Sequence, residues 1–186
     1  MNMLKKITIG IVILLALIFV ISLFLPATVN VERSVVIDAP KKAVFEQINT
    51  IKKWEVWKGP WQDKDPGIKI TYSGPESGQG AKLYFDSKHP DTGQGSVMIL
   101  KSNPYSSLKT EISFGDGGGA NGNWQFKDAA HGTKVIWRLT VNLGMNPVKK
   151  IMGNLMMDRM VGPDFEKGLA SLKNVCENRS GTSQHQ

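Results

Sequence analysis

The stretch SVVIDAPKKAVFEQINTIKKWEVWKGPW, residues 34–61, decides the fold. Val35 and Ile37 alternate with their neighbours in the manner of a half-buried strand, and Pro40 then presets a backbone angle suited to the first turn of a helix. The sequence therefore predicts a strand that passes directly into a helix.

Two short helices are expected after this strand. The first presents an apolar face at helical spacing, formed by Val44, Phe45 and Ile48. Thr50 can cap the second, which carries Ile51 and Trp54. Three tryptophans lie within eight residues of one another: Trp54, Trp57 and Trp61. Such a concentration of large apolar rings requires another layer of structure to cover it, and the remaining chain must supply that layer.

Six segments of alternating apolar and polar residues come next, separated by turns rich in glycine. They cover residues 68–73, 81–86, 96–101, 108–114, 124–126 and 133–143. No helix-length segment lies between them, so they are expected to pair as antiparallel hairpins in one sheet. The glycine-rich GDGGGANG, residues 115–122, precedes a strand and contains no lysine, which favours a hairpin connection over a phosphate-binding loop.

One long helical pattern, residues 147–178, follows the sheet and can cover its apolar face. Its apolar stripe consists of Ile151, Met152, Leu155, Met156, Met160, Phe165, Leu169, Leu172 and Val175 or Cys176. Gly162 and Pro163 interrupt the stripe, so a kink or a break between two helical pieces is expected there. The polar tail, residues 179–186, is expected to be disordered.

The N-terminal segment ITIGIVILLALIFVISLFL, residues 7–25, is nineteen residues long and carries no charge. As a helix it would rise about 28 Å, close to the roughly 30 Å hydrocarbon core of a bilayer. It is longer than the apolar core of a cleaved signal peptide, and only Ala27 and Val29 offer a poor small-residue cleavage site. We therefore favour an uncleaved signal anchor with a short linker, residues 1–29, over a cleaved signal peptide.

Charges on the two sides of this segment bear on its orientation. Lys5 and Lys6 precede it and favour a cytoplasmic N-terminus with an extracytoplasmic domain. Arg33, Lys41 and Lys42 follow it and reduce the asymmetry, although the two lysines belong to a domain that can be translocated regardless of charge. The expected arrangement is a single-pass membrane protein with its domain outside the cytoplasm.

The net charge of +7 does not indicate a nucleic-acid partner, because no basic run is longer than two residues. The lone Cys176 excludes an intramolecular disulfide and a cysteine-based zinc site, and we interpret it as a core thiol in preference to a reactive one. The histidines are isolated, and neither an H-E-x-x-H helix nor a G-x-S-x-G elbow is present. No metal, cofactor or catalytic residue is predicted.

The order β-α-α-β6-α with a long C-terminal helix resembles the START-related helix-grip superfamily, SRPBCC, and within it the polyketide cyclase/dehydrase and lipid-transport type. Matching positions near the start are Ile37, Ala39, Pro40, Val44, Phe45, Trp54, Trp57, Pro60 and Trp61. Further matches are Gly78, Gly80, Ala81, Gly132, Thr133, Phe165, Glu166, Gly168, Leu169 and Leu172. The resemblance covers residues 30–177, within one expected domain of residues 30–178.

The resemblance implies an α+β helix-grip fold, in which a curved antiparallel sheet wraps around the long helix and leaves a mostly apolar cavity. The residues expected to line it for ligand binding are Trp54, Trp57, Tyr72, Phe85, Phe114, Trp137, Met152 and Met156. Ordinary core packing is the alternative for each of them singly. Glu111 and Arg138 are expected to face solvent, and would orient a ligand only if the sheet turned that face inward.

The function best supported by the sequence is a membrane-anchored protein that binds a hydrophobic small molecule or lipid in an internal cavity. An enzyme of the cyclase/dehydrase type is one alternative and would require polar groups that converge inside the cavity. A protein-interaction module is another and would require an exposed apolar patch. Binding is favoured over catalysis because no convergent catalytic set is found, and the same scaffold serves binders and enzymes.

Overall fold

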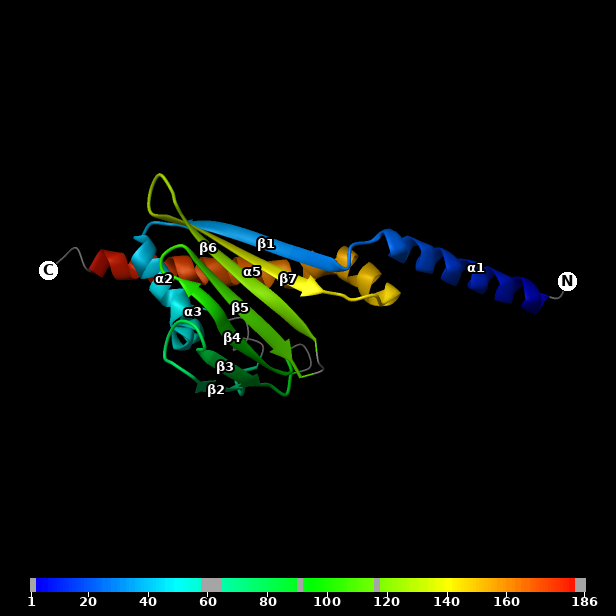
Figure 1. The fold of residues 1–186 in the computed structure, drawn as a ribbon, viewed down its shortest axis with the longest axis horizontal. Helices are drawn as coiled ribbons and strands as arrows, with labels where there is room; N and C mark the ends of the chain where they lie inside the picture. The colour runs from blue at the N-terminus through cyan, green and yellow to red at the C-terminus, as the bar shows by residue number, and fades with distance from the viewer. Residues whose placement is uncertain (1–2, 58–64, 90–91, 116–117, 183–186) are drawn as a thin grey trace.

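The computed structural model describes residues 3–57, 65–89, 92–115 and 118–182. It confirms the α+β helix-grip fold, with a seven-stranded antiparallel sheet packed against one long C-terminal helix. A second long helix, at the N-terminus, projects from one end of the domain (Figure 1). Trp61 and the neighbouring Pro60 lie outside the described residues.

The elements follow the predicted order. They are α1 (Met3–Phe24), β1 (Thr28–Ile37), α2 (Lys41–Asn49), the 3-10 helix η1 (Ile51–Lys53), α3 (Trp54–Trp57), β2 (Lys69–Ser73), β3 (Lys82–Asp86), β4 (Gln94–Asn103), β5 (Ser107–Phe114), β6 (Gly119–Asp128), β7 (Thr133–Asn142) and α5 (Pro147–Thr182). Thr50 stands at the cap position of η1, although its side chain makes no capping hydrogen bond.

Strand β6 begins earlier than predicted, inside the glycine-rich run. Gly119 pairs with Ser113, and Gly122 pairs with Thr110, so this part of the run is strand. A Cβ atom at Gly122 would lie 2.2 Å from Oγ1 of Thr110, which leaves no room for a side chain. Glycine at this position allows β5 and β6 to approach each other closely. Composition alone does not distinguish this role from that of a glycine in a flexible loop.

The sheet is a meander that the first strand joins at one edge, in the order β1-β7-β6-β5-β4-β3-β2. Strand β1 pairs with β7 over its whole length, from Thr28 opposite Asn142 to Ile37 opposite Thr133. Because β1 follows α1 and β7 precedes α5, this pairing brings the end of α1 beside the start of α5.

The inner face of the sheet forms the core with α2 and α5. Alternate strand residues such as Leu83, Val97 and Val135 are fully buried, as the alternation predicted. The second half of α5 contributes Phe165, Leu169, Leu172 and Cys176 to the same core. The thiol of Cys176 is buried, in agreement with its interpretation as a core residue.

Helix α5 runs unbroken through Gly162 and Pro163, where a kink or break was expected. The guanidinium of Arg33 on β1 lies across this position. It donates two hydrogen bonds to Asp158, at 2.9 and 3.1 Å, and one to Glu166 at 2.6 Å. A Cβ atom at Gly162 would approach Nη2 of Arg33 to 2.3 Å. The glycine therefore makes room for the arginine that fastens β1 to the helix.

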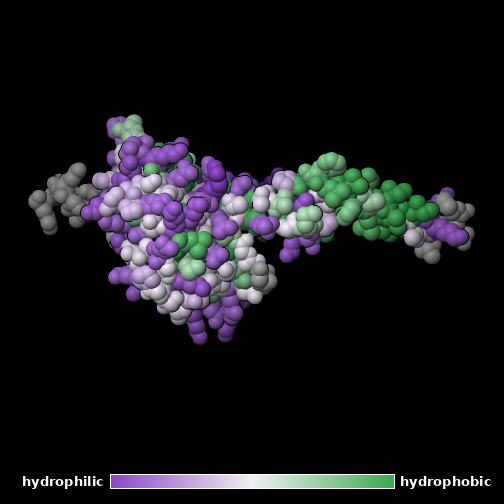
Figure 2. Space-filling view, viewed as in Figure 1, coloured by the Kyte–Doolittle hydropathy of each residue, from purple (hydrophilic) through white to green (hydrophobic). Residues whose placement is uncertain are grey.

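Helix α1 is the one described helix that is long and apolar enough to cross a membrane. Its side chains are almost all exposed, and Figure 2 shows it as a hydrophobic rod beside a domain surface that is largely hydrophilic. Length and composition suit a membrane anchor or a signal sequence equally.

The turn between β6 and β7 provides a first test of the fold. Gly132 has a φ of 80°, and a Cβ atom there would lie 2.1 Å from the carbonyl oxygen of Ile37. Gly132→Ala should lower the free energy of unfolding by more than the roughly 1–3 kcal/mol that left-handed strain alone costs. Gly93→Ala is the matched control, because Gly93 has a φ of 58° and open space around it. Urea unfolding in detergent measures both, and equal losses would contradict the predicted clash.

The contact between Arg33 and Asp158 should make stability depend on pH. Hydrogen bonds from Arg33 lower the pKa of Asp158 below its usual 3.8. A lowered pKa means that this stabilisation is complete above about pH 4 and disappears as the pH falls through the folded-state pKa. Asp158→Asn should therefore lower the urea midpoint at neutral pH and weaken its decline in acid. Glu111→Gln, at an exposed carboxylate on β5, should leave the profile parallel to wild type; an unchanged midpoint for Asp158→Asn would contradict the prediction.

Candidate functional site

Aromatic rings fill the space between the sheet and the second half of α5. Trp124 stacks on Trp137 with ring centroids 4.1 Å apart, and Trp137 stacks on Phe165 of α5 at 3.7 Å. Trp54 and Trp57 each meet Trp124 edge to face at 6.0 Å. All five rings are buried, so this half of the interface is packed core.

The two helical tryptophans are also fixed by hydrogen bonds. The indole N–H of Trp54 donates to the carbonyl of Ile48 at 2.7 Å, and that of Trp57 donates to the carbonyl of Gln47 at 3.2 Å. These bonds join α3 to the end of α2 and orient both rings toward the sheet. A buried ring whose indole N–H is hydrogen-bonded to the protein is typical of a structural tryptophan.

The first half of α5 leaves an apolar groove against the sheet, with a volume of about 480 Å³. Its lining comes from the ends of β5 and β7, the start of β6 and one face of the helix. The described lining residues are Phe114, Gly118, Gly119, Val141, Asn142, Leu143, Lys149, Met152, Gly153, Met156, Met157 and Met160. The volume lies in the range of small-molecule sites, and the flexible thioethers of methionine suit ligands of irregular shape.

Local capping positions this face of the helix. Oδ1 of Asn146 accepts hydrogen bonds from the backbone N–H of Val148 and Lys149, at 2.9 and 3.1 Å, and so fixes where α5 begins. Met152, Met156 and Met160 then recur every fourth residue and lie on one side of the helix. Leu143 packs closely on Gly153, whose Cβ atom would lie 2.6 Å from Cδ1 of that leucine.

The electrostatic character of the groove is simple. Lys149 is the one titratable side chain among the described lining residues, and Asn142 is the one amide. Lys149 is exposed at the end of the groove where α5 begins, and its ammonium group has no carboxylate partner among the described residues. The groove therefore offers an apolar wall with a single positive charge at one end.

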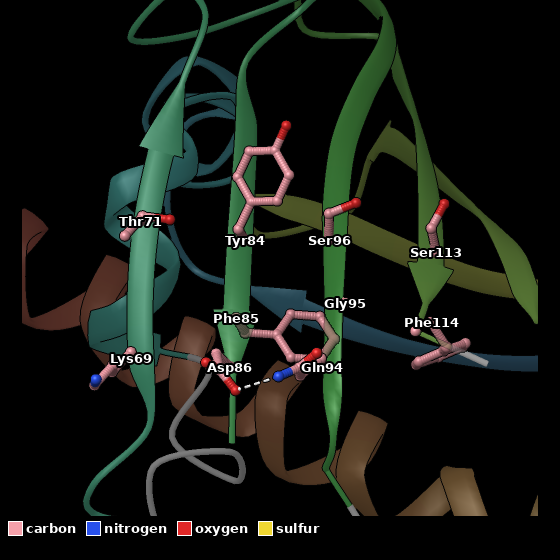
Figure 3. Close-up of a pocket in the computed structure, with 11 residues that line it drawn as sticks. Lys69, Thr71, Tyr84, Phe85, Asp86, Gln94, Gly95, Ser96, Ser113 and Phe114 are labelled. Carbon is pink, nitrogen blue, oxygen red and sulfur yellow. Dashed lines mark hydrogen bonds between the residues drawn. The ribbon is translucent and has the colours of Figure 1, made fainter. Parts of the chain in front are cut away.

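A second groove, of about 530 Å³, is more polar and lies mainly along the outer face of β2 to β5, although the inward-facing Phe85 and Phe114 also line it. Figure 3 shows Thr71, Tyr84, Ser96 and Ser113 in a row across four strands, with a hydrogen bond of 2.9 Å between Gln94 and Asp86. Tyr84 and Asp86 flank the buried Phe85, so they point away from the core. This row lies on the outer surface of β2 to β5.

Ionisable groups on the outer face make structural contacts. Hydrogen bonds from Lys82 and Ser73 lower the pKa of Tyr84. Arg138 pairs with Glu32 at 2.5 Å, and Glu111 is exposed, so both groups considered as ligand-orienting residues face outward. Among the described residues, no three His, Cys, Asp or Glu side chains lie close enough to hold a metal ion.

The eight residues predicted to bind ligand fall into separate places. Phe114, Met152 and Met156 line the apolar groove together. Tyr72 is half-buried at a small pocket near η1 and bonds to Glu55, while burial and this hydrogen bond raise its pKa. The buried members of the set are Trp54, Trp57, Phe85 and Trp137. A binding role for each of the eight stays a prediction.

Several groove residues were absent from the predicted set: Leu143, Lys149, Gly153, Met157 and Met160. The spacing of methionines every fourth residue was a usable signal for Met160. The others depend on where the sheet ends relative to the helix, which the pattern of a single segment does not contain.

The chain was compared with protein families, curated proteins and solved structures. A family described as polyketide cyclase / dehydrase and lipid transport matches residues 28–177. The comparison with curated proteins found no match.

Solved structures with the same fold share little sequence. Protein CV1439 from Chromobacterium violaceum has 15% identity and a TM-score of 0.56, over 82% of this chain and 99% of that chain. The Aha1 dimer from Colwellia psychrerythraea has 16% identity and a TM-score of 0.55, over 80% and 96%. The di-domain ARO/CYC StfQ of the steffimycin biosynthetic pathway has 16% identity and a TM-score of 0.58, over 83% and 52%. At these identities the likeness concerns the fold.

Substitution of Trp137 should affect stability but not ligand binding, because Trp137 lies in the packed core and not in the groove. Trp137→Ala removes the ring between Trp124 and Phe165 and should lower the free energy of unfolding by about 3–5 kcal/mol. Trp137→Phe keeps a ring in the stack and should cost less. Because the groove is lined by other residues, hydrophobic ligand bound per folded molecule, measured by native mass spectrometry, should be unchanged in Trp137→Phe. Loss of bound ligand in that variant with its stability retained would place Trp137 in the binding site instead.

Proposed function

This chain belongs to the polyketide cyclase/dehydrase and lipid transport family, and from that premise we propose that it is a membrane-anchored protein that binds a lipid or similar hydrophobic molecule. The ligand would lie in the groove between the first half of α5 and the ends of β5 to β7. The observation that carries the proposal is the row of Met152, Met156 and Met160, which is exposed along the groove, whereas the second half of the helix packs into the core.

The chemistry of the groove favours binding over catalysis. An acid–base mechanism needs at least two groups that converge on a substrate, and the described lining provides Lys149 as its only titratable side chain. Cyclase structures such as the ARO/CYC StfQ share the fold, but a fold shared at 16% identity carries no activity with it. Apolar burial along the methionines would supply the affinity, at roughly 25 cal/mol per Å² of apolar surface.

The anchor is supported by how the domain uses the end of α1. Lys150 is only 6% exposed, and its ammonium group donates a hydrogen bond to the carbonyl of Ser22, at 3.1 Å. Removal of α1 by a signal peptidase would take away this hydrogen-bond partner and expose the part of α5 against which α1 packs. Lys5 and Lys6 before the helix favour a cytoplasmic N-terminus and an extracytoplasmic domain.

A charge placed on the methionine wall tests the proposal. Met156→Glu puts a carboxylate into the groove and should reduce copurifying lipid at least about tenfold, since burying an unpaired charge costs more than the 1.4 kcal/mol that a factor of ten represents. The full chain is extracted from membranes in mild detergent and analysed by native mass spectrometry. The same spectrum shows from the protein mass whether residues 1–25 are retained.

Leu155→Glu is the matched control. Leu155 is the adjacent residue on α5 and is 71% exposed, but it does not line the groove. This variant should keep the wild-type amount of lipid. Equal lipid loss in both variants, or no bound lipid in the wild type, would contradict the proposed site.

A further inference from the structure

The domain is hydrogen-bonded at one point to the last turn of α1 and at two points to the connector that follows it, residues 25–27. The backbone N–H of Leu143, just after β7, donates to the carbonyl of Ala27 at 2.8 Å. Lys150 in the first turns of α5 donates to the carbonyl of Ser22, and Asn154 one turn later donates to the carbonyl of Pro26 at 3.2 Å. These three bonds hold the last turn of α1 and the connector after it, so α1 is joined to the domain through a bonded segment and not through a free linker.

The cap on α1 is suited to the end of a helix. A helix exposes unpaired carbonyls and a partial negative charge at its C-terminus, and a lysine ammonium satisfies both. The side chain of Ser22 is 2% exposed, unlike its neighbours on α1, because this face of the last turn packs against α5. Only residues 25–27 separate α1 from β1, which leaves little chain for independent movement.

Apolar side chains are exposed at the same end of the domain. Met145, in the loop between β7 and α5, is 79% exposed, and Val148 in the first turn of α5 is 65% exposed. Their neighbours Leu143 and Lys150 are hydrogen-bonded to Ala27, just after α1, and to Ser22, in its last turn, so Met145 and Val148 lie near the end of α1. When α1 spans a bilayer, these two side chains therefore lie at the depth where its apolar segment ends, which is the interface of that bilayer.

The methionine groove opens at this end as well. Lys149 stands between Val148 and the first methionine, and the lining continues along α5 to Met160. From Lys149 to Met160 the helix rises about 16 Å, so the groove leads from the level of the interface into the body of the domain. Lysine at a bilayer surface keeps its stem in apolar surroundings and its ammonium group near lipid phosphates.

We propose that the β7–α5 loop and the first turn of α5 rest in the interface of the bilayer that α1 spans, so that a phospholipid of that bilayer enters the groove directly. Met145 and Val148 insert among the lipids, Lys149 pairs with the phosphate, and an acyl chain lies along the methionines. This inference rests on the proposed function and adds the source of the ligand, the direction from which it enters and the group that holds its headgroup.

The bilayer is a better occupant for this surface than a second protein. The exposed apolar residues are continuous with the end of a membrane-length helix, and the hydrogen bonds of Lys150 and Asn154 fix that relation. A protein partner would have to cover Met145 and Val148 at the level where lipid headgroups already surround α1. Lys149 adds a charge that complements an anionic phosphate.

A spin label at position 145 tests the placement. The full chain carrying Met145→Cys is labelled, while the native Cys176 is buried and should not react in the folded protein. After reconstitution into phosphatidylcholine–phosphatidylglycerol vesicles, the label should be severalfold more accessible to oxygen than to a water-soluble nickel chelate. His131→Cys is the control, because the β6–β7 turn lies at the other end of β7, about 30 Å away, and its label should show the opposite preference.

A second variant tests the fastening itself. Lys150→Met with Asn154→Ala removes the described bond from α5 to α1 and the one from α5 to Pro26, and keeps the apolar segment intact. The label at position 145 should then lose most of its preference for oxygen, while the protein stays in the vesicles. A label that reports water at position 145 in the otherwise unaltered chain would overturn the inference. A double variant whose label stays at the same depth would overturn the role given to Lys150 and Asn154.

Lipid binding is measured separately, so that the two proposals can fail independently. Bound phospholipid with position 145 in water would retain the proposed function and overturn its placement at the bilayer. Position 145 in the bilayer with no phospholipid bound would remove the proposed function, and with it the route that depends on it. Lys149→Gln should reduce the preference for phosphatidylglycerol over phosphatidylcholine severalfold, and an unchanged preference would overturn the headgroup assignment.

Discussion

The pairing of β1 with β7 is the constraint on which the other features depend. It joins the first strand of the domain to the last, with Thr28 opposite Asn142 at one end. Because α1 ends just before β1 and α5 begins just after β7, that register sets the two helix ends side by side. The hydrogen bonds to α1, the start of the groove and the exposed Met145 all follow from this one antiparallel ladder. A shift by one residue would also turn the apolar face of β1 outward.

Helix α5 serves two purposes in its two halves, and the change occurs near Gly162. Beyond it, Phe165 begins the stack of rings that fills the space under the sheet. Before it, Met152, Met156 and Met160 lie on a different face of the helix from Phe165, and this face is exposed along the groove. Arg33 spans the boundary through Asp158 and Glu166, one turn before and one turn after the glycine. The aromatic half can therefore stabilise the position of the helix while the methionine half remains open.

Most of the fold could be predicted from the sequence, because alternating apolar and polar residues, glycine-rich turns and a long amphipathic stretch are local signals. It also contained part of the groove in Met152 and Met156. It could not distinguish Trp57 in a core from Trp57 in a cavity, since both environments select a large apolar ring. Helix α5 continues through Gly162 and Pro163, and Arg33, distant in sequence, occupies the space beside the glycine. Such contacts appear only when β1 is placed against α5.

Lys150 is buried where α5 meets the end of α1. A lysine is rarely buried without a partner, because removing an ammonium group from water costs several kcal/mol. Here the described partner is the carbonyl of Ser22, in the last turn of α1, where the helix dipole also favours a positive charge. Hydrophobic side chains could fill the same space at lower cost, but they would leave the helix carbonyl unsatisfied. The lysine thus makes the orientation of α1 specific, and a specific orientation matters when the groove beside it must open toward the surface from which its ligand comes.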